Sequence, residues 1–172
     1  MARSRASRSS RPRGVKLYSD LVRRLGRTRA FSSLASRILP PLDRHFPTHP
    51  PTALGTDFPL CYLTVRGRRS GEPRTVPLLH VSDGARVVLI ASNWGRRRHP
   101  AWALNLEAAG EAMVAGPDRT AARAMTSRRA SAEEFDRYWS DALRIWPGYE
   151  GYRRRAGREI RMFVLDPKTR AP

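Results

Sequence analysis

Two short segments of the chain contain side chains suited to binding an anionic organic molecule. The first covers residues 64–78 and concentrates cations, hydroxyls and glycines around one turn. Guanidinium forks and free backbone N–H groups are the donors that phosphate and carboxylate groups require. The residues that provide them are Arg68, Arg69, Ser70 and Arg74, with Thr75 and Val76 adjoining. On composition alone, an exposed basic turn without a ligand is the favoured alternative.

The second segment runs from Ala91, Ser92 and Asn93 through a loop to residues 99–106. We expect a strand end, a loop and a helix N-terminus to meet here, an arrangement that favours anions. Trp102 and Asn105 are three residues apart and therefore share a helix face. A planar group can stack on such an indole while the amide binds its edge. The alternative is that Trp102 belongs to the core.

The sequence lacks the motifs of several other kinds of chemistry. No His/Cys cluster has metal-ligand spacing, and there is no nucleophile elbow, Walker loop or Gly-x-Gly-x-x-Gly motif. The only cysteine, Cys61, lies in an apolar run, which indicates a buried structural thiol. If the protein is an enzyme, we therefore expect an organic cofactor to supply the chemistry.

The charge is strongly positive, with 33 Lys plus Arg against 15 Asp plus Glu and a formal net charge of +18. Residues 1–58 and residues 59–172 carry +9 each, so the N-terminal part is about twice as dense in charge. Such a balance favours an anionic partner: a nucleic acid, a membrane surface or a polyanionic small molecule. No stretch approaches the roughly 18 apolar residues of a membrane span.

The elements that would position the two segments follow from the pattern of apolar residues. We expect a disordered basic tail over 1–14, an amphipathic helical extension with a Pro-rich linker over 15–58, and the main domain over 59–172. In that domain, strands are predicted at 60–65, 74–82 and 86–92, followed by a helix at 100–109. Two strands follow, then a helix with Ser131 as N-cap, a short helix over 149–155 and a strand at 162–165. This order predicts an antiparallel sheet that closes on itself, with helices outside.

The two segments together resemble a known family, the deazaflavin-dependent nitroreductases, which use coenzyme F-420. Order and spacing of the shared motifs are kept from about Leu63 to Leu165. One departure is Asn93-Trp94, where Lys-Gly is common in the family. The shared motifs are Gly67-Arg68-Arg69-Ser70-Gly71, Pro73-Arg74, Pro77-Leu78, Asp83-Gly84, Ala91-Ser92, His99-Pro100-Ala101-Trp102, Asn105-Leu106, Pro147-Gly148-Tyr149 and Tyr152.

The resemblance implies an α+β fold: a split β-barrel like that of the FMN-binding proteins, flanked by helices. The apolar spacing and charge of residues 15–58 add the basic helical extension before it. It implies F-420 as cofactor, with FMN the less favoured alternative, and hydride transfer to an electron-poor nitroaromatic, quinone or enone. The acidic tail would lie on Arg68, Arg69, Ser70 and Arg74, beside Thr75 and Val76. The ring would lie along Ala91, Ser92 and Asn93, backed by Ala101, Trp102 and Asn105, with Ser92 as the catalytic hydrogen-bond donor. The implied substrate side is Leu79, Trp146, Tyr149 and Tyr152, for which aromatic packing at a helix junction is an equal alternative.

Other expectations concern partners and location. A non-enzymatic module that binds nucleic acid is the main alternative, which we disfavour because no readout motif is present. Residues 15–45 can either attach to an anionic membrane surface or fold over the barrel or a second copy in a homodimer. We expect a cytoplasmic protein, with peripheral attachment to the inner face of the membrane as one alternative.

Overall fold

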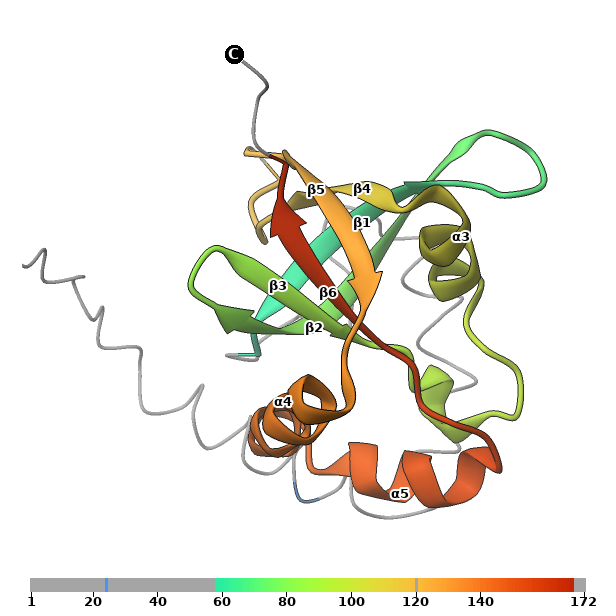
Figure 1. Ribbon diagram of the computed structural model, residues 1–172, viewed down its shortest axis with the longest axis vertical. Helices are drawn as coiled ribbons and strands as arrows, with labels where there is room; N and C mark the ends of the chain where they lie inside the picture. The colour runs from blue at the N-terminus through green and yellow to red at the C-terminus, as the bar shows by residue number, and fades with distance from the viewer. Residues whose placement is uncertain (1–23, 25–57, 120, 169–172) are drawn as a thin grey trace, which may run out of the picture.

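The computed structural model describes Arg24, residues 58–119 and residues 121–168. The elements follow one another in the predicted order, which the structure confirms (Figure 1). They are β1 (Leu60–Arg66), β2 (Pro73–Asp83), β3 (Arg86–Ile90), the 3-10 turn η1 (Asn93–Gly95), α3 (Ala101–Ala109), β4 (Glu111–Ala115), β5 (Arg123–Arg129), α4 (Ala132–Ile145), α5 (Gly148–Ala156) and β6 (Met162–Pro167).

The six strands form one closed antiparallel barrel in the order β1-β2-β3-β6-β5-β4. β1 closes it by pairing with β2 on one side, where Leu63 faces Val76, and with β4 on the other, where Leu63 faces Val114. In Figure 1, α3 lies beside the barrel on the side of the β1–β2 hairpin, while α4 and α5 cover the opposite end. The predicted α+β barrel with outer helices is therefore confirmed.

Central strands β3 and β6 are apolar at consecutive positions because both of their faces are buried. Leu89 and Phe163 point into the barrel, where they join the core cluster that also includes residues of α3. Their neighbours Val88 and Val164 point outward, into a second cluster that α4 and α5 cover. All four side chains are 1% exposed or less. Continuous apolar runs are typical of strands covered on both faces.

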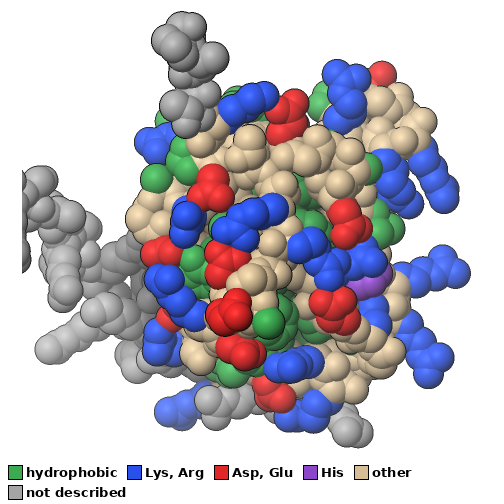
Figure 2. Space-filling view, in the orientation of Figure 1, with side chains coloured by type: hydrophobic (Ala, Val, Ile, Leu, Met, Phe, Trp, Pro, Cys, Tyr) green, Lys and Arg blue, Asp and Glu red, His purple; other side chains and the backbone are tan. Residues whose placement is uncertain are grey.

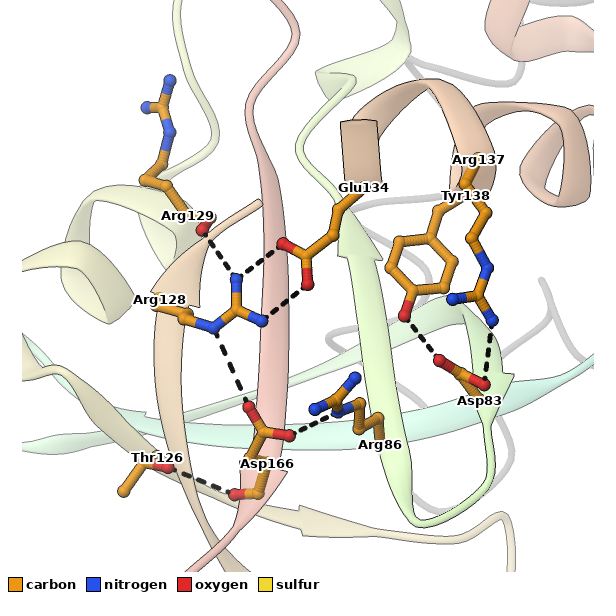
Figure 3. Close-up of polar contacts among 9 residues, drawn as sticks. All are labelled: Asp83, Arg86, Thr126, Arg128, Arg129, Glu134, Arg137, Tyr138 and Asp166. Atoms are coloured by element: carbon orange, nitrogen blue, oxygen red, sulfur yellow. Dashed lines mark hydrogen bonds and ion pairs between the residues drawn. The ribbon is translucent and has the colours of Figure 1, made fainter. Parts of the chain in front are cut away.

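Helix α4 begins where the sequence predicts, at the N-cap Ser131. Its hydroxyl accepts the backbone N–H of Glu134 (3.2 Å), and the Glu134 carboxylate accepts the N–H of Ser131 (2.9 Å), which completes a capping box. The same carboxylate pairs with Arg128 through two bonds of 2.6 Å each (Figure 3). These contacts lower the pKa of Glu134 to about 2. They attach the start of α4 to β5.

Two details of the predicted elements can be compared with the structure. Cys61 is 2% exposed and burial raises its pKa to about 12, as expected of a structural thiol. The third strand ends at Ile90 rather than at the predicted Ser92. At Ser92 the backbone is already helical, because the chain turns there to enter η1. Apart from Arg24 and Phe58, the predicted tail over 1–14 and extension over 15–58 lie outside the described residues.

None of the helices in the described ranges is long and apolar enough to span a membrane. The same residues contain no group of three or more His, Cys, Asp or Glu side chains placed to hold a metal ion.

Candidate functional site

The first predicted segment forms the β1–β2 hairpin, whose turn extends beyond the barrel in Figure 1. Arg68, Arg69, Ser70 and Arg74 are all exposed on it, with Thr75 exposed and Val76 half-buried beside them. The Ser70 hydroxyl accepts the backbone N–H of Glu72 (3.3 Å), which closes the turn. The Thr64 and Thr75 hydroxyls lie 2.8 Å apart across the two strands. The hairpin therefore presents its basic side chains to solvent.

Arginines of the described region fall into two groups, according to whether an acid neutralises them. Several around α4, β5 and β6 form ion pairs, such as Arg86 with Asp166 and Arg137 with Asp83 (Figure 3). The hairpin arginines Arg68, Arg69 and Arg74 form no ion pair with a described residue. Figure 2 shows the difference, with red and blue mixed across the centre and mostly blue along the edge on the hairpin side. The hairpin therefore carries unneutralised positive charge.

A polar contact joins the hairpin to the second predicted segment. Asn105 on α3 is 7% exposed, and its side-chain oxygen accepts both the backbone N–H of Arg68 (3.3 Å) and an N–H of its guanidinium (3.2 Å). The two residues are 37 positions apart in the chain. The amide that we expected at the edge of a ligand ring thus uses its oxygen to attach the hairpin to α3. The two segments predicted separately are in direct contact.

Helix α3 places Trp102 between core and solvent. The indole is half-buried and meets the Phe163 ring edge-on, with 5.9 Å between the centroids. Its neighbours on either side differ sharply in exposure, since Ala101 is exposed while Ala103 is completely buried in the barrel core. Trp102 is therefore partly a core residue, as the alternative interpretation expected. Its remaining surface faces outward at the helix N-terminus.

The end of β3 leads into a turn of unusual backbone conformation. Ala91 is fully buried and Ser92 is 8% exposed. Asn93, Trp94 and Gly95 then have positive φ angles of +48°, +58° and +77° in succession. A bulky residue such as Trp is rare in this region of φ/ψ space and costs energy there. The Trp94 ring packs against Tyr152 of α5, with 5.9 Å between the centroids.

Sequence reasoning missed one residue that contacts this turn from the other side, Arg158 in the α5–β6 connection. Its guanidinium donates to the backbone oxygens of Ala91 and Ser92, both at 3.2 Å. It also donates to the oxygens of Arg96 (3.1 Å) and Arg98 (3.3 Å). Backbone carbonyls are present at every residue, so no sequence motif could have indicated these partners.

The predicted substrate residues gather in one aromatic cluster between the barrel and helices α4 and α5. Trp146, Tyr149 and Tyr152 are 6%, 6% and 2% exposed, and Leu79 packs against the same cluster. The Trp146 indole N–H donates to the Tyr152 hydroxyl (3.1 Å). Burial raises the pKa of Tyr149, so its phenol is neutral at ordinary pH. The structure brings these four residues together, and their role toward a substrate remains a prediction.

His99 lies beside Arg158 and supplies a pH-dependent contribution to stability. An N–H of Arg158 lies 3.1 Å from Nδ1 of His99. Burial lowers the pKa of His99 below 6.5; the positive charges of Arg158, Arg161 and Arg129 lower it further, and only Glu107 opposes them. Burial also lowers the pKa of His80. Both imidazoles therefore resist protonation in the folded protein.

We expect the free energy of unfolding to fall as pH decreases from 7 to 5. Below the unfolded pKa of about 6.5, the unfolded chain takes up protons that the folded protein resists, so stability is lost as pH falls. His99→Asn should have a shallower dependence, because its amide oxygen can accept from Arg158 without titrating. Urea unfolding at several pH values measures the slope of the unfolding free energy against pH for the wild type and for the variant. Equal slopes for wild type and variant would show that His99 does not carry the effect. The stability that Glu134 contributes also falls as pH decreases toward its ordinary pKa of 4.5, but Glu134 is present in both proteins and its effect cancels in the comparison.

Comparison with known proteins gives a family match over most of the chain. Residues 50–167 match the model of the F-420H(2)-dependent quinone reductase family. A Mycobacterium tuberculosis protein named as an F-420H(2)-dependent quinone reductase is 29% identical over 120 residues, which cover 67% of this chain and 98% of that protein. A solved F-420-H₂-dependent reductase superposes with a TM-score of 0.56 at 29% identity, over 63% of this chain and 94% of its own. Another structure, described as a domain-swapped dimer, has a TM-score of 0.58 at 27% identity, over 72% of this chain and 92% of its own.

Proposed function

The chain belongs to the F-420H(2)-dependent quinone reductase family and is an oxidoreductase with F-420 as its cofactor; on this premise we propose which residues hold the coenzyme and the acceptor. The acidic tail binds the exposed turn of the β1–β2 hairpin. Arg68, Arg69 and Arg74 contact its phosphate and carboxylates, with the Ser70 hydroxyl as a further donor. Thr75 and Val76 line the adjoining strand.

One observation carries this assignment: three neighbouring arginines of the hairpin are exposed and form no ion pair with a described residue. Several arginines around α4, β5 and β6 do form such pairs, for example Arg86, Arg128 and Arg137. Paired arginines already have their charge balanced, so a ligand must compete with an internal acid. The hairpin guanidiniums meet no such competition. The Arg68–Asn105 contact also keeps the turn next to α3. A multiply charged anion therefore finds three unneutralised guanidinium groups on one hairpin here.

The ring of the coenzyme lies beside Ala91, Ser92 and Asn93, at the barrel end that α3 adjoins. The small side chain of Ala91 would leave space for a flat ring, and the Ser92 hydroxyl would serve as its hydrogen-bond donor. Ala101, Trp102 and Asn105 support the ring from α3. When bound, reduced F-420 supplies the hydride. The protein residues contribute orientation and exclusion of water.

The acceptor binds toward the aromatic cluster of Leu79, Trp146, Tyr149 and Tyr152. A flat, apolar quinone is suited to such aromatic surroundings. The bond from the Trp146 indole N–H to the Tyr152 hydroxyl fixes these two rings relative to each other. A quinone-type acceptor agrees with the family. We propose that electron-poor nitroaromatics and enones are reduced at the same place, as expected of the related nitroreductases.

A binding titration followed by an oxidation assay tests the proposal. Purified protein is titrated with F-420, FMN and haem, and oxidation of reduced F-420 is then followed with a soluble quinone and a nitroaromatic. We expect F-420 to bind with a dissociation constant on the order of micromolar, and more tightly than FMN or haem. Quinone-dependent oxidation should exceed the rate without acceptor. Tighter binding of FMN, or no binding of F-420, would contradict the proposal.

Two further parts of the proposal concern what surrounds the barrel. Residues 15–45 attach the enzyme to an anionic membrane surface, close to lipid-soluble quinones at the inner face of the cell membrane. Support comes from the charge and apolar spacing of these residues, which lie outside the described region apart from Arg24. Co-sedimentation with anionic vesicles, with and without residues 1–45, tests this attachment. Homodimer formation is also part of the proposal and is checked by light scattering.

A further inference from the structure

The turn at the end of β3 has a strained backbone, which contacts with the surrounding structure must stabilise. Asn93, Trp94 and Gly95 all have positive φ, although only the last is glycine. Non-glycine residues in this conformation cost on the order of 1 kcal/mol or more each, and they persist only where the surrounding structure fixes them. Within the turn, Gly95 N–H donates to Ser92 O and Arg96 N–H to Asn93 O, each at 3.0 Å. The Asn93 side-chain amide also donates to Arg98 O (2.8 Å). Three such bonds are few for so strained a segment.

Arg158 supplies most of the additional contacts. Its guanidinium reaches the carbonyl oxygens of Ala91, Ser92, Arg96 and Arg98 and the Nδ1 of His99, at distances from 3.1 to 3.3 Å. These acceptors lie on both sides of the strained turn. Ala91, the farthest in sequence, is 67 residues from Arg158. One side chain therefore connects the end of β3, the turn and the loop that leads to α3.

The geometry also explains why an arginine is needed. A guanidinium presents five N–H donors in a rigid plane, whereas a lysine ammonium is a compact group with three. Arg158 forms no ion pair with a described residue, and its charge is met by carbonyl dipoles. Unlike the hairpin arginines, it is only partly exposed. Its donors are directed at the backbone and are not available to a ligand.

We propose that Arg158 is a positioning residue, which fixes the backbone of residues 91–99 in the conformation that receives the deazaflavin ring. The inference rests on the proposed function for the identity of the ring. Whether Arg158 stabilises the backbone of residues 91–99 does not depend on the coenzyme and can be measured in its absence. Arg158 acts through Ala91, Ser92 and Asn93 and does not touch the coenzyme itself.

The test compares Arg158→Lys with wild type in two measurements. Without coenzyme, hydrogen exchange should be at least tenfold faster at the amides of Gly95 and Arg96 and unchanged at the barrel amide of Val88. With coenzyme, the dissociation constant of F-420 should rise at least tenfold. The ¹⁵N spectrum of His99 should also change, because Nδ1 loses the guanidinium donor. If Arg158 only stabilised the fold as a whole, hydrogen exchange would accelerate at Val88 as well as at Gly95 and Arg96.

Arg154→Lys is the matched control. Arg154 lies nearby on α5, is 72% exposed and pairs with Glu150, so the same substitution leaves the turn untouched. We expect wild-type exchange and wild-type affinity for this variant. The proposal is overturned if Arg158→Lys leaves exchange at Gly95 unchanged, if exchange also accelerates at Val88, or if F-420 still binds with wild-type affinity. Failure of the wild-type protein to bind F-420 would defeat the proposed function instead, and the exchange data would still decide whether Arg158 holds the turn.

Discussion

Replacing Arg69 and Arg74 together with alanine is expected to weaken F-420 binding about 100-fold, because each charged contact to the tail contributes about 1.4 kcal/mol and every such step is tenfold. Both side chains are exposed and form no ion pair with a described residue, so their removal leaves no unpaired acid in the described structure. Stability should therefore stay within about 0.5 kcal/mol of wild type. Fluorescence titration of F-420 measures the affinity, and urea unfolding measures the stability.

The matched control for this variant is the double replacement Arg137→Ala and Arg144→Ala. It removes the same two positive charges, but from ion pairs with Asp83 and Asp141 on the side of α4. We expect unchanged F-420 binding in the control, since α4 lies at the end of the barrel opposite the hairpin tip (Figure 1). Raising the salt concentration should reduce the difference in F-420 affinity between the wild type and the Arg69/Arg74 variant, because salt screens exposed charges. Equal affinity of the two double variants would mean that net charge, and not the hairpin, attracts the coenzyme.

Gly95→Ala is expected to have the largest effect of any small substitution in the site, with a loss of about 3 kcal/mol of stability. Two causes add. The residue has a φ of +77°, which alanine adopts only with strain. A Cβ there would also lie 3.0 Å from Tyr152 Cα and 3.1 Å from Tyr152 O, and these are backbone atoms of α5, which shift less easily than the end of a flexible side chain. The turn and α5 would have to move apart by a few tenths of an ångström, so F-420 binding should weaken as well.

Gly110→Ala separates the two causes. Gly110 follows α3 with a φ of +68°, and nothing lies within 4 Å of the position where its Cβ would stand. Only the conformational cost remains there, so the expected loss is about 1 kcal/mol. Urea unfolding of both variants gives the comparison. If the two substitutions cost the same, the contact between the turn and α5 does not contribute to stability.

Much of the fold could be predicted because its signals are local. The capping box of Ser131 and Glu134 spans one turn of helix, and the hairpin signal Asp83-Gly84 spans two residues. The apolar runs around Val88 and Val164 marked strands buried on both faces. Propensity, capping and turn chemistry depend on neighbours within about four residues, and all of those are visible in the sequence. The end of β3 was misjudged because Ala91 continues the apolar run beyond the last paired residue, and neither Ala91 nor Ser92 is a typical turn residue, although the backbone is already helical at Ser92.

By itself, the sequence determined the order of the strands and helices, the family pattern and the arginine-rich hairpin, since these depend on residue type and spacing. Only the tertiary structure decided which arginines are neutralised, that Asn105 binds Arg68, and that Arg158 holds a strained turn. The physical reason is that these contacts join groups far apart in the chain, often through backbone carbonyls that every residue possesses. Their geometry is set by how the barrel closes, which no local pattern encodes.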